Sequence, residues 1–213
     1  MSHGVHAVQH EAEHKIQHDE EHGGLGGGSK DLNKRVALLI AVLALFLAFS
    51  ETLGKSAQTA ALNSQIEASN LWNFFQAKNI RRTSTIIAGE QTKLDIAAAT
   101  DPAQKAAIQK QVDEWSKTAA RYRSEPEAAN GKGEGTVELA RRALEEQHHR
   151  DEFLAKYHHY EFASAAFQIG IVLASATVIT GMVVLSYLAG GLGVLGLAFM
   201  ALGLLAPHLL HLH

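Results

Sequence analysis

Three long apolar stretches constrain the fold of this chain more than any other feature. They cover residues 36–49, 162–187 and 188–206, and a long polar insert separates the first from the second. A helix that spans a bilayer needs about 20 mostly apolar residues, and residues 162–187 meet this need without a charged side chain. The segregation predicts a membrane protein, although a hydrophobic content of 46% is that of an ordinary soluble domain.

The first apolar stretch is the shortest, within the range of a buried core helix, but residues 50–54 extend it to a spanning length. The second and third follow each other so closely that they predict a tight transmembrane hairpin. No cleavable signal peptide precedes the first stretch, so we expect an uncleaved anchor. The expected division of the chain is a His-rich, Gly-linked N-terminal tail at 1–35, a transmembrane helix at 36–54, an extramembrane helical stalk at 55–160, transmembrane helices at 161–187 and 188–207, and a His-containing C-terminus at 208–213.

The polar insert is expected to be helical throughout. Residues 54–100 contain no proline, so the first span is predicted to continue as one long helix. Along this helix, mostly large apolar side chains recur every seven residues. This spacing indicates a heptad seam that packs against a partner helix. The seam positions are Ile66, Asn73, Ile80, Ile87 and Leu94.

Asp101-Pro102 predicts the start of a second helix at 103–123, since proline is tolerated at the first helical position. One face of this helix carries Ile108, Val112, Trp115, Ala119 and Tyr122, at spacings that place all five on one stripe.

A Gly-rich loop follows, and Thr136 is expected to cap a third helix that continues into the second span. From the helix lengths we favour an all-α fold with three transmembrane helices and a long antiparallel, coiled-coil-like stalk. A compact three-helix bundle, with the loop climbing back beside the second helix, is the alternative.

Histidines recur every four residues in the N-terminal tail, at His6, His10, His14, His18 and His22. On a helix such residues share one face, where neighbouring imidazoles bind zinc, nickel or copper. The simpler interpretation is a solvated tail with a compositional bias. A pH-responsive face is the third, because imidazole changes charge between about pH 5 and 8. No other cofactor is expected.

A second histidine group, His148, His149, His158 and His159, precedes the second apolar stretch. We interpret these residues as surface and membrane-interface pairs with nearby glutamates. A metal or proton site beside Glu51 is the alternative.

Asparagine and glutamine are concentrated in residues 63–79. Amides at seam positions weaken a helix pair but fix its register and oligomeric state, so we interpret them as a structural lock. A polar vestibule above a pore is the alternative interpretation.

Several motifs resemble one bacterial inner-membrane protein family, catalogued as a domain of unknown function, family 4337. They are residues 57–63, the run Ile66-Glu67-Ala68-Ser69-Asn70-Leu71-Trp72, the run Phe75-Gln76-Ala77-Lys78 with Arg81, residues 122–126, and the helix into residues 162–173. The resemblance implies three helical spans in a bacterial inner membrane. It implies no activity, ligand or catalytic residue.

We expect a non-enzymatic scaffold that self-associates in the bilayer. A channel or transport component built from symmetric copies is the alternative, and a metal- or pH-responsive protein acting through the His-rich tail is another. Small residues that would let spans of different copies approach closely lie at Ala37, Ala41, Ala44, Ala48, Ala166, Gly170 and Ala174.

An enzyme is not expected, because the chain has no Gly-rich phosphate loop, nucleophile motif or HExxH pattern. With no cysteine it has no thiolate chemistry, and a formal net charge of −3 does not attract nucleic acid. The expected partners are the lipid bilayer and further copies of the chain. Lys34 and Arg35 favour a cytoplasmic N-terminus, which would place the stalk in the periplasm.

Overall fold

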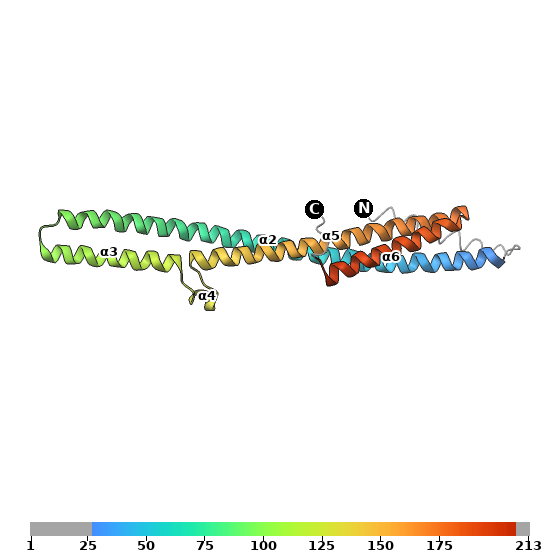
Figure 1. Ribbon diagram of the computed structural model, residues 1–213, viewed down its shortest axis with the longest axis horizontal. Coiled ribbons are helices and arrows are strands. Elements are labelled where there is room, and N and C mark those ends of the chain that lie inside the picture. Colours follow the sequence, from blue (N-terminus) through green and yellow to red (C-terminus); the bar gives the residue numbers. More distant parts are fainter. Residues whose placement is uncertain (1–26, 208–213) are drawn as a thin grey trace. The chain divides into compact units, whose positions relative to one another are not determined.

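The computed structural model describes residues 27–207, and these are almost entirely helical, with no strand among them. The helices are α2 (Gly27–Ala98), α3 (Pro102–Arg123), α4 (Ala128–Gly131), α5 (Thr136–Thr180) and α6 (Val183–Leu205). They pack as two units, shown in Figure 1. Unit 1 contains the chain up to Ala61 and from Asp151 onward, and unit 2 contains Leu62–Arg150. Three helices, α2, α5 and α6, are long and apolar enough to cross a membrane, as predicted.

The core of unit 1 forms where α2, α5 and α6 meet. Leu43 of α2 and Phe167 and Ile171 of α5 are almost completely buried there, and the rings of Phe46 and Phe167 stack with their centroids 6.0 Å apart. Small residues of α6 let this helix approach the other two closely, and Figure 1 shows α6 lying beside α5. The buried small positions of α6 are Ala189, Gly193, Gly196 and Gly203.

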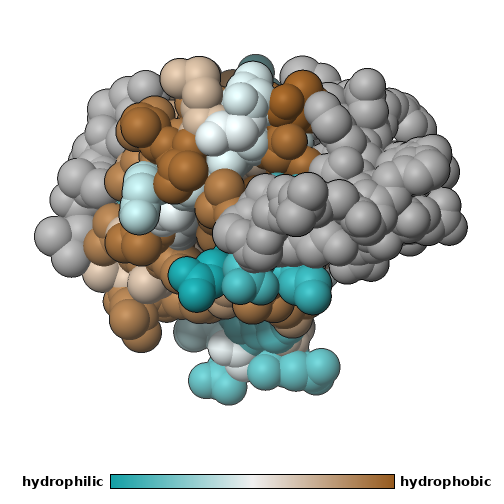
Figure 2. Space-filling view, turned by 90° about the vertical axis from the view of Figure 1, so that its right-hand side faces the viewer, coloured by the Kyte–Doolittle hydropathy of each residue, from teal (hydrophilic) through white to brown (hydrophobic). Residues whose placement is uncertain are grey.

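Apolar side chains also cover the outside of unit 1. Leu38 and Leu45 of α2 and Leu195 and Leu204 of α6 are exposed. Figure 2 shows hydrophobic residues over much of the face that it presents, with hydrophilic residues gathered toward the bottom. A surface of this kind is costly in water and is typical of helices that face lipid.

The break between the second and third apolar helices lies earlier than predicted. We expected the division at residues 187 and 188, but α5 ends at Thr180 and α6 begins at Val183. Gly181 ends the helix because its backbone takes φ +71°, in the left-handed region that glycine enters at no steric cost. The Thr180 hydroxyl accepts a hydrogen bond from the backbone NH of Met182, which completes the turn.

In unit 2, α3 packs beside the C-terminal part of α2 (Figure 1). A Cβ atom at Gly89 would lie 3.4 Å from Cβ of Trp115, so the two helices touch at van der Waals distance. The predicted stripe of α3 is confirmed as its inner face, because Val112 and Ala119 are buried and Ile108, Trp115 and Tyr122 are half-buried. Asp101 caps this helix by accepting from the NH of Ala103 at 3.1 Å, with Pro102 as its first residue.

The predicted heptad seam of α2 is wrong in register. Ile66, Ile80 and Leu94 are exposed by 51%, 66% and 73%, and Asn73 and Ile87 are exposed as well. Another series with the same spacing packs against α3 and α5 instead. Its buried or half-buried members in unit 2 are Ser64, Ala68, Leu71, Phe75, Lys78, Arg82, Thr85 and Gly89. Half of this series, Ser64, Ala68, Thr85 and Gly89, has small side chains, which let helices approach closely.

The N-terminal part of α5 packs against an earlier stretch of α2 than α3 does. Leu71 of α2 and Leu139 and Ala143 of α5 form a small buried cluster, with Trp72 and Phe75 against it. The Trp72 and Phe75 rings meet edge to face, with centroids 5.3 Å apart. Successive stretches of α2 therefore contact first α5 and then α3.

Candidate functional site

The most unusual side chain of unit 2 is Lys78, a lysine on the buried face of a helix. It occupies the position of the packed series of α2 that lies one heptad after Leu71, and its side chain is only 8% exposed. A buried ammonium group is costly unless it is paired and hydrogen-bonded. Lys78 is therefore the natural starting point for a site.

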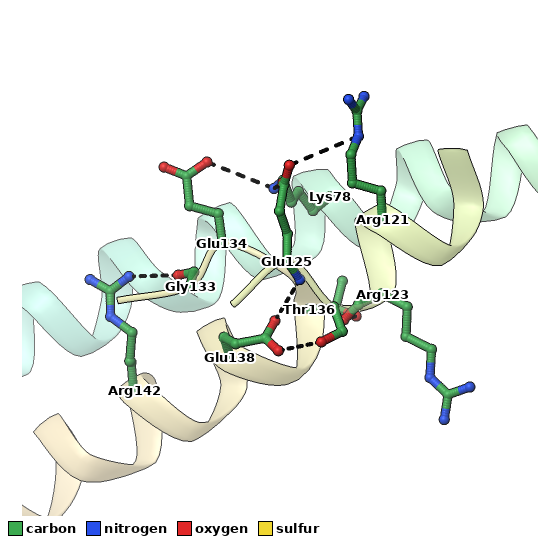
Figure 3. Close-up of polar contacts among 10 residues, drawn as sticks. Lys78, Arg121, Arg123, Glu125, Gly133, Glu134, Thr136, Glu138 and Arg142 are labelled. Atoms are coloured by element: carbon green, nitrogen blue, oxygen red, sulfur yellow. Dashed lines mark hydrogen bonds and ion pairs between the residues drawn. The ribbon is translucent and has the colours of Figure 1, made fainter. Parts of the chain in front are cut away.

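Two carboxylates from outside α2 neutralise Lys78 (Figure 3). Its Nζ donates to Oε2 of Glu125 at 3.3 Å and lies 3.8 Å from Oε2 of Glu134. Arg121 Nε lies 4.0 Å from the other oxygen of Glu125, and the Lys78 ammonium also lies 5.6 Å from the ring centroid of Phe74. We call Lys78, Glu125 and Glu134 the Lys78 junction.

The connection between α3 and α5 supplies both of these carboxylates. It contains α4, a tight turn rather than a true helix, since Ala129 and Asn130 have left-handed φ angles of 52° and 57°. Gly135 has to be a glycine, because a Cβ atom there would lie 2.7 Å from the carbonyl oxygen of Arg123. The backbone is thus folded tightly enough to bring residues 125 and 134 to the same lysine.

Hydrogen bonds at the first turn of α5 hold this connection in place (Figure 3). The Glu138 carboxylate accepts from the Ser124 hydroxyl and from the backbone NH of Glu125 at 3.3 Å. Arg142 donates to the carbonyl of Gly133 at 3.2 Å. Thr136 was expected to cap α5, but its hydroxyl donates instead to the carbonyl of Arg123 at 3.3 Å. Thr136 and Glu138 together tie the start of α5 to the end of α3.

The pKa of Glu138 reflects this role. Partial burial raises the pKa of its carboxyl, but the hydrogen bonds from Ser124 and from backbone NH groups outweigh that effect, so the pKa lies below its ordinary value of 4.5. A carboxyl whose pKa is lowered by folding contributes stability above its unfolded pKa, and loses it as the pH falls through its folded pKa. The hydrogen bonds of Glu138 to the end of α3 are therefore weakest in acid.

We expect the Glu138→Gln variant to unfold with a flatter pH dependence than the wild type between about pH 5 and pH 3. The glutamine side chain carries no charge, so acid does not protonate it in this pH range and its contribution to stability stays constant. The measurement is the thermal unfolding midpoint in one detergent at several pH values, followed by circular dichroism. Glu127→Gln, at an exposed residue of the same connection, should keep the wild-type slope. Equal slopes in all three proteins would contradict the assignment.

The chemistry of the Lys78 junction is that of a clamp. The Lys78 ammonium donates to Glu125 and lies beside Glu134, so it connects α2 to the connection between α3 and α5. A hollow of about 310 Å³ is lined by acidic and basic side chains that include Glu67, Arg141 and Arg142. Arg141 pairs with Glu145, and Arg142 donates to the carbonyl of Gly133.

The histidines proposed as metal ligands, His6, His10, His14, His18 and His22, lie outside the described residues. Zinc, nickel or copper binding at the tail therefore stays a prediction. Within residues 27–207, no three His, Asp or Glu side chains come together in a group that could hold a metal ion.

The second histidine group is not gathered around Glu51. His159 is fully buried in unit 1, and its Nε2 lies 3.1 Å from the carbonyl oxygen of Pro207. His158 pairs with Glu161 at 3.6 Å, as the surface-pair interpretation predicted. Glu51 instead accepts from Gln168 at 3.3 Å. His158, His159 and Glu51 thus each have a separate partner, and they do not surround a common ligand.

The amides expected at the packed seam lie on the opposite side. Asn63, Asn70, Asn73, Gln76 and Asn79 are all exposed, so they do not lock the contact of α2 with α3 or α5. The small residues of α5 are likewise used inside the chain, since Ala166, Gly170 and Ala174 are buried and cannot face another copy.

Sequence reasoning missed the Lys78 junction because its members lie far apart in the chain. A usable signal was present, namely a lysine at the same heptad position as Ala57, Ser64 and Leu71. This heptad series is recognised as the packed face of α2 only when its small residues, such as Ala57 and Ser64, are counted as packing residues.

The model of a family described as Domain of unknown function (DUF4337) matches residues 32–206, which include all of unit 2 and nearly all of the described residues of unit 1. No curated protein and no solved structure matches the chain.

Proposed function

Because the chain belongs to the DUF4337 family, whose function is unknown, its own residues have to carry the argument, and we propose that it is a non-enzymatic, self-associating scaffold of a membrane. The observation that carries the proposal is a row of large apolar side chains on α2 within unit 2. Leu62, Ile66, Ile80, Ile87 and Leu94 are each more than half exposed. Large apolar side chains that recur in the open along one face of a polar region are typical of an interaction surface.

The membrane part of the proposal rests on α2, α5 and α6. Each contains a long apolar window, and their exposed leucines in unit 1 are suited to contact with acyl chains. We place these helices in a bacterial inner membrane, as a multi-pass protein. Lys34 and Arg35 next to the first apolar segment favour a cytoplasmic N-terminus, which puts unit 2 in the periplasm.

Unit 2 is then the extramembrane stalk. The contacts of α5 with Leu71 and of α3 with Gly89 support an antiparallel, coiled-coil-like hairpin, in which α3 and α5 return along successive stretches of α2. They favour this arrangement over a compact three-helix bundle. The Lys78 junction lies where the two returning helices follow one another and would hold the stalk together.

The test is the oligomeric state of the full chain in a mild detergent, measured by light scattering with the detergent mass subtracted. We expect a discrete oligomer, and a loss of affinity of at least tenfold in Ile80→Lys, because a charge on an apolar interface is desolvated without a partner. Leu144→Lys is the matched control, since Leu144 of α5 is also exposed, by 57%, but is not on the row. A strictly monomeric wild type would overturn the proposal.

A further inference from the structure

We infer that the exposed row on α2 binds a second copy of this chain, parallel and in register, so that Asn73 of one copy faces Asn73 of the other. This inference rests on the proposed self-association and names its partner and geometry. The surface consists of two interleaved positions of one heptad, which we call the exposed stripe. It contains Leu62, Ile66, Ser69, Asn73, Gln76, Ile80, Thr83, Ile87, Glu90 and Leu94, and extends about 50 Å at 1.5 Å per residue. Glu90, near its end, is its one charged member.

The exposed stripe is separate from the face that the chain uses for its own packing. Leu71, Lys78 and Thr85 are buried, and they alternate along α2 with Ile66, Asn73, Ile80 and Ile87, which are exposed. Both series have the spacing that brings side chains of neighbouring helices into contact over many turns. Within unit 2, α2 thus carries two heptad faces, and α3 and α5 occupy only one of them.

The composition of the exposed face fits an identical partner. From residue 62 to residue 87 the stripe and the positions that flank it in the heptad carry no charged side chain. Two copies of one charged face would repel each other where like charges meet. An uncharged face avoids that repulsion, and its flanks are rich in groups that pair with themselves, since each amide both donates and accepts hydrogen bonds. The flanking residues are Asn63, Gln65, Asn70, Trp72, Ala77, Asn79, Ser84 and Ile86.

The order of side chains along the stripe gives the register. Isoleucines at 66, 80 and 87 occupy one heptad position, and Asn73 interrupts them. A single asparagine among apolar residues at one heptad position pairs best with its own counterpart and so fixes the register. Copies inserted in one membrane with the same orientation present parallel stripes. Only when the two copies are parallel and in register does every residue at the heptad position of Asn73 face the same residue of the other copy.

The pairing is expected to be reversible. The second heptad position carries Ser69, Gln76 and Thr83 rather than leucines, so the apolar contact per turn is smaller than in a leucine zipper. Confinement of both copies to one bilayer raises their effective concentration and offsets that weakness. Association and dissociation can then alternate without unfolding.

The absence of cysteine from the sequence permits a direct test. Single variants Ile66→Cys, Ile80→Cys and Leu94→Cys of the full chain are oxidised in membranes with copper phenanthroline. Disulfides require Cβ atoms within about 4.5 Å, a distance that a parallel, in-register pair brings within reach at all three sites. Glu67→Cys and Arg81→Cys, at exposed residues one position beyond the stripe, are the matched controls. We expect at least fivefold more crosslinked dimer from the three stripe variants than from the controls.

The outcomes separate this inference from the proposed function. Crosslinking of Ile80→Cys without Ile66→Cys and Leu94→Cys would indicate antiparallel pairing and overturn the register. Equal crosslinking at stripe and control sites, with a discrete wild-type oligomer by light scattering, would overturn the stripe as interface and leave self-association standing. A monomeric wild type would overturn both. Thermal unfolding of each cysteine variant under reducing conditions confirms that it is folded as the wild type is.

Discussion

The Gly196→Leu variant is expected to lower the thermal stability of the protein more than any other single exchange in α6. A Cβ atom at residue 196 would lie 2.7 Å from Cε1 of Phe167, and Phe167 has no exposed surface into which it can move. Overpacking of this kind costs about 1–3 kcal/mol, or roughly 2–12 °C in a protein of this size. Circular dichroism during heating in one detergent measures the shift.

Gly191→Leu is the matched control for that experiment. Gly191 lies on the same helix, but it is exposed, and no side chain and no other helix comes within 4 Å of a Cβ placed there. Its unfolding midpoint should stay within about 2 °C of the wild type, because surface exchanges rarely exceed 0.5 kcal/mol. Equal losses in Gly191→Leu and Gly196→Leu would show that helix α6 tolerates no leucine for reasons unrelated to Phe167.

The second large effect is expected at Lys78. In Lys78→Met the side chain keeps its length and apolar stem but loses the charge, which leaves Glu134 without its lysine and Glu125 with only the exposed Arg121 at 4.0 Å. Removing one partner of a buried ion pair costs about 3–5 kcal/mol. The two carboxylates are about one third exposed, so solvent screening reduces the expected loss to roughly 1–3 kcal/mol. Chemical unfolding followed by tryptophan fluorescence measures it.

Lys93→Met provides the comparison for Lys78. Lys93 pairs with Glu90 on the same helix at 2.7 Å, but both side chains are more than half exposed, so the loss should stay below about 0.5 kcal/mol. A second comparison is the double variant Glu125→Gln with Glu134→Gln, which leaves the buried ammonium unpaired and should be at least as unstable as Lys78→Met. Wild-type stability in Lys78→Met would mean that the junction contributes nothing to the fold.

Local signals in the sequence predicted the helical fold and the start of α3. Asp101 and Pro102 indicated the start of α3, because a capping carboxylate and a proline at the first helical position act within one turn of the helix. The inner stripe of α3 followed from the spacing of Val112, Trp115 and Ala119, since only one face of this helix is apolar. The apolar segments were equally plain, as length and the lack of charge decide them.

The packing register of α2 could not be read in the same way, because two heptad series compete on that helix. Counting large apolar side chains selects Ile66, Ile80 and Ile87, and the structure exposes them. The buried series contains Ala68 and Gly89, which add little to any hydrophobicity count. They pack because helices approach most closely where side chains are small. The Lys78 junction was hidden for a related reason, since Glu125 and Glu134 reach it only through the tertiary fold.

The break at Gly181 shows a further limit of composition. Residues 162–206 contain no charge, so apolarity alone cannot place the end of one helix and the start of the next. A single glycine with a left-handed backbone decides it, and other glycines close by in the sequence, such as Gly190 and Gly191, lie inside α6.

The division of α2 into two heptad faces has a consequence for how this family can diversify. Residues that hold the chain together in unit 2 and residues of the exposed stripe are different positions of the same helix. Mutations in one set therefore leave the other unchanged, and their effects on stability and on assembly should add independently. Under the proposed self-association, evolution can alter the strength, the number or the identity of the associated copies while the protomer keeps its structure, and related proteins that fold alike need not recognise one another.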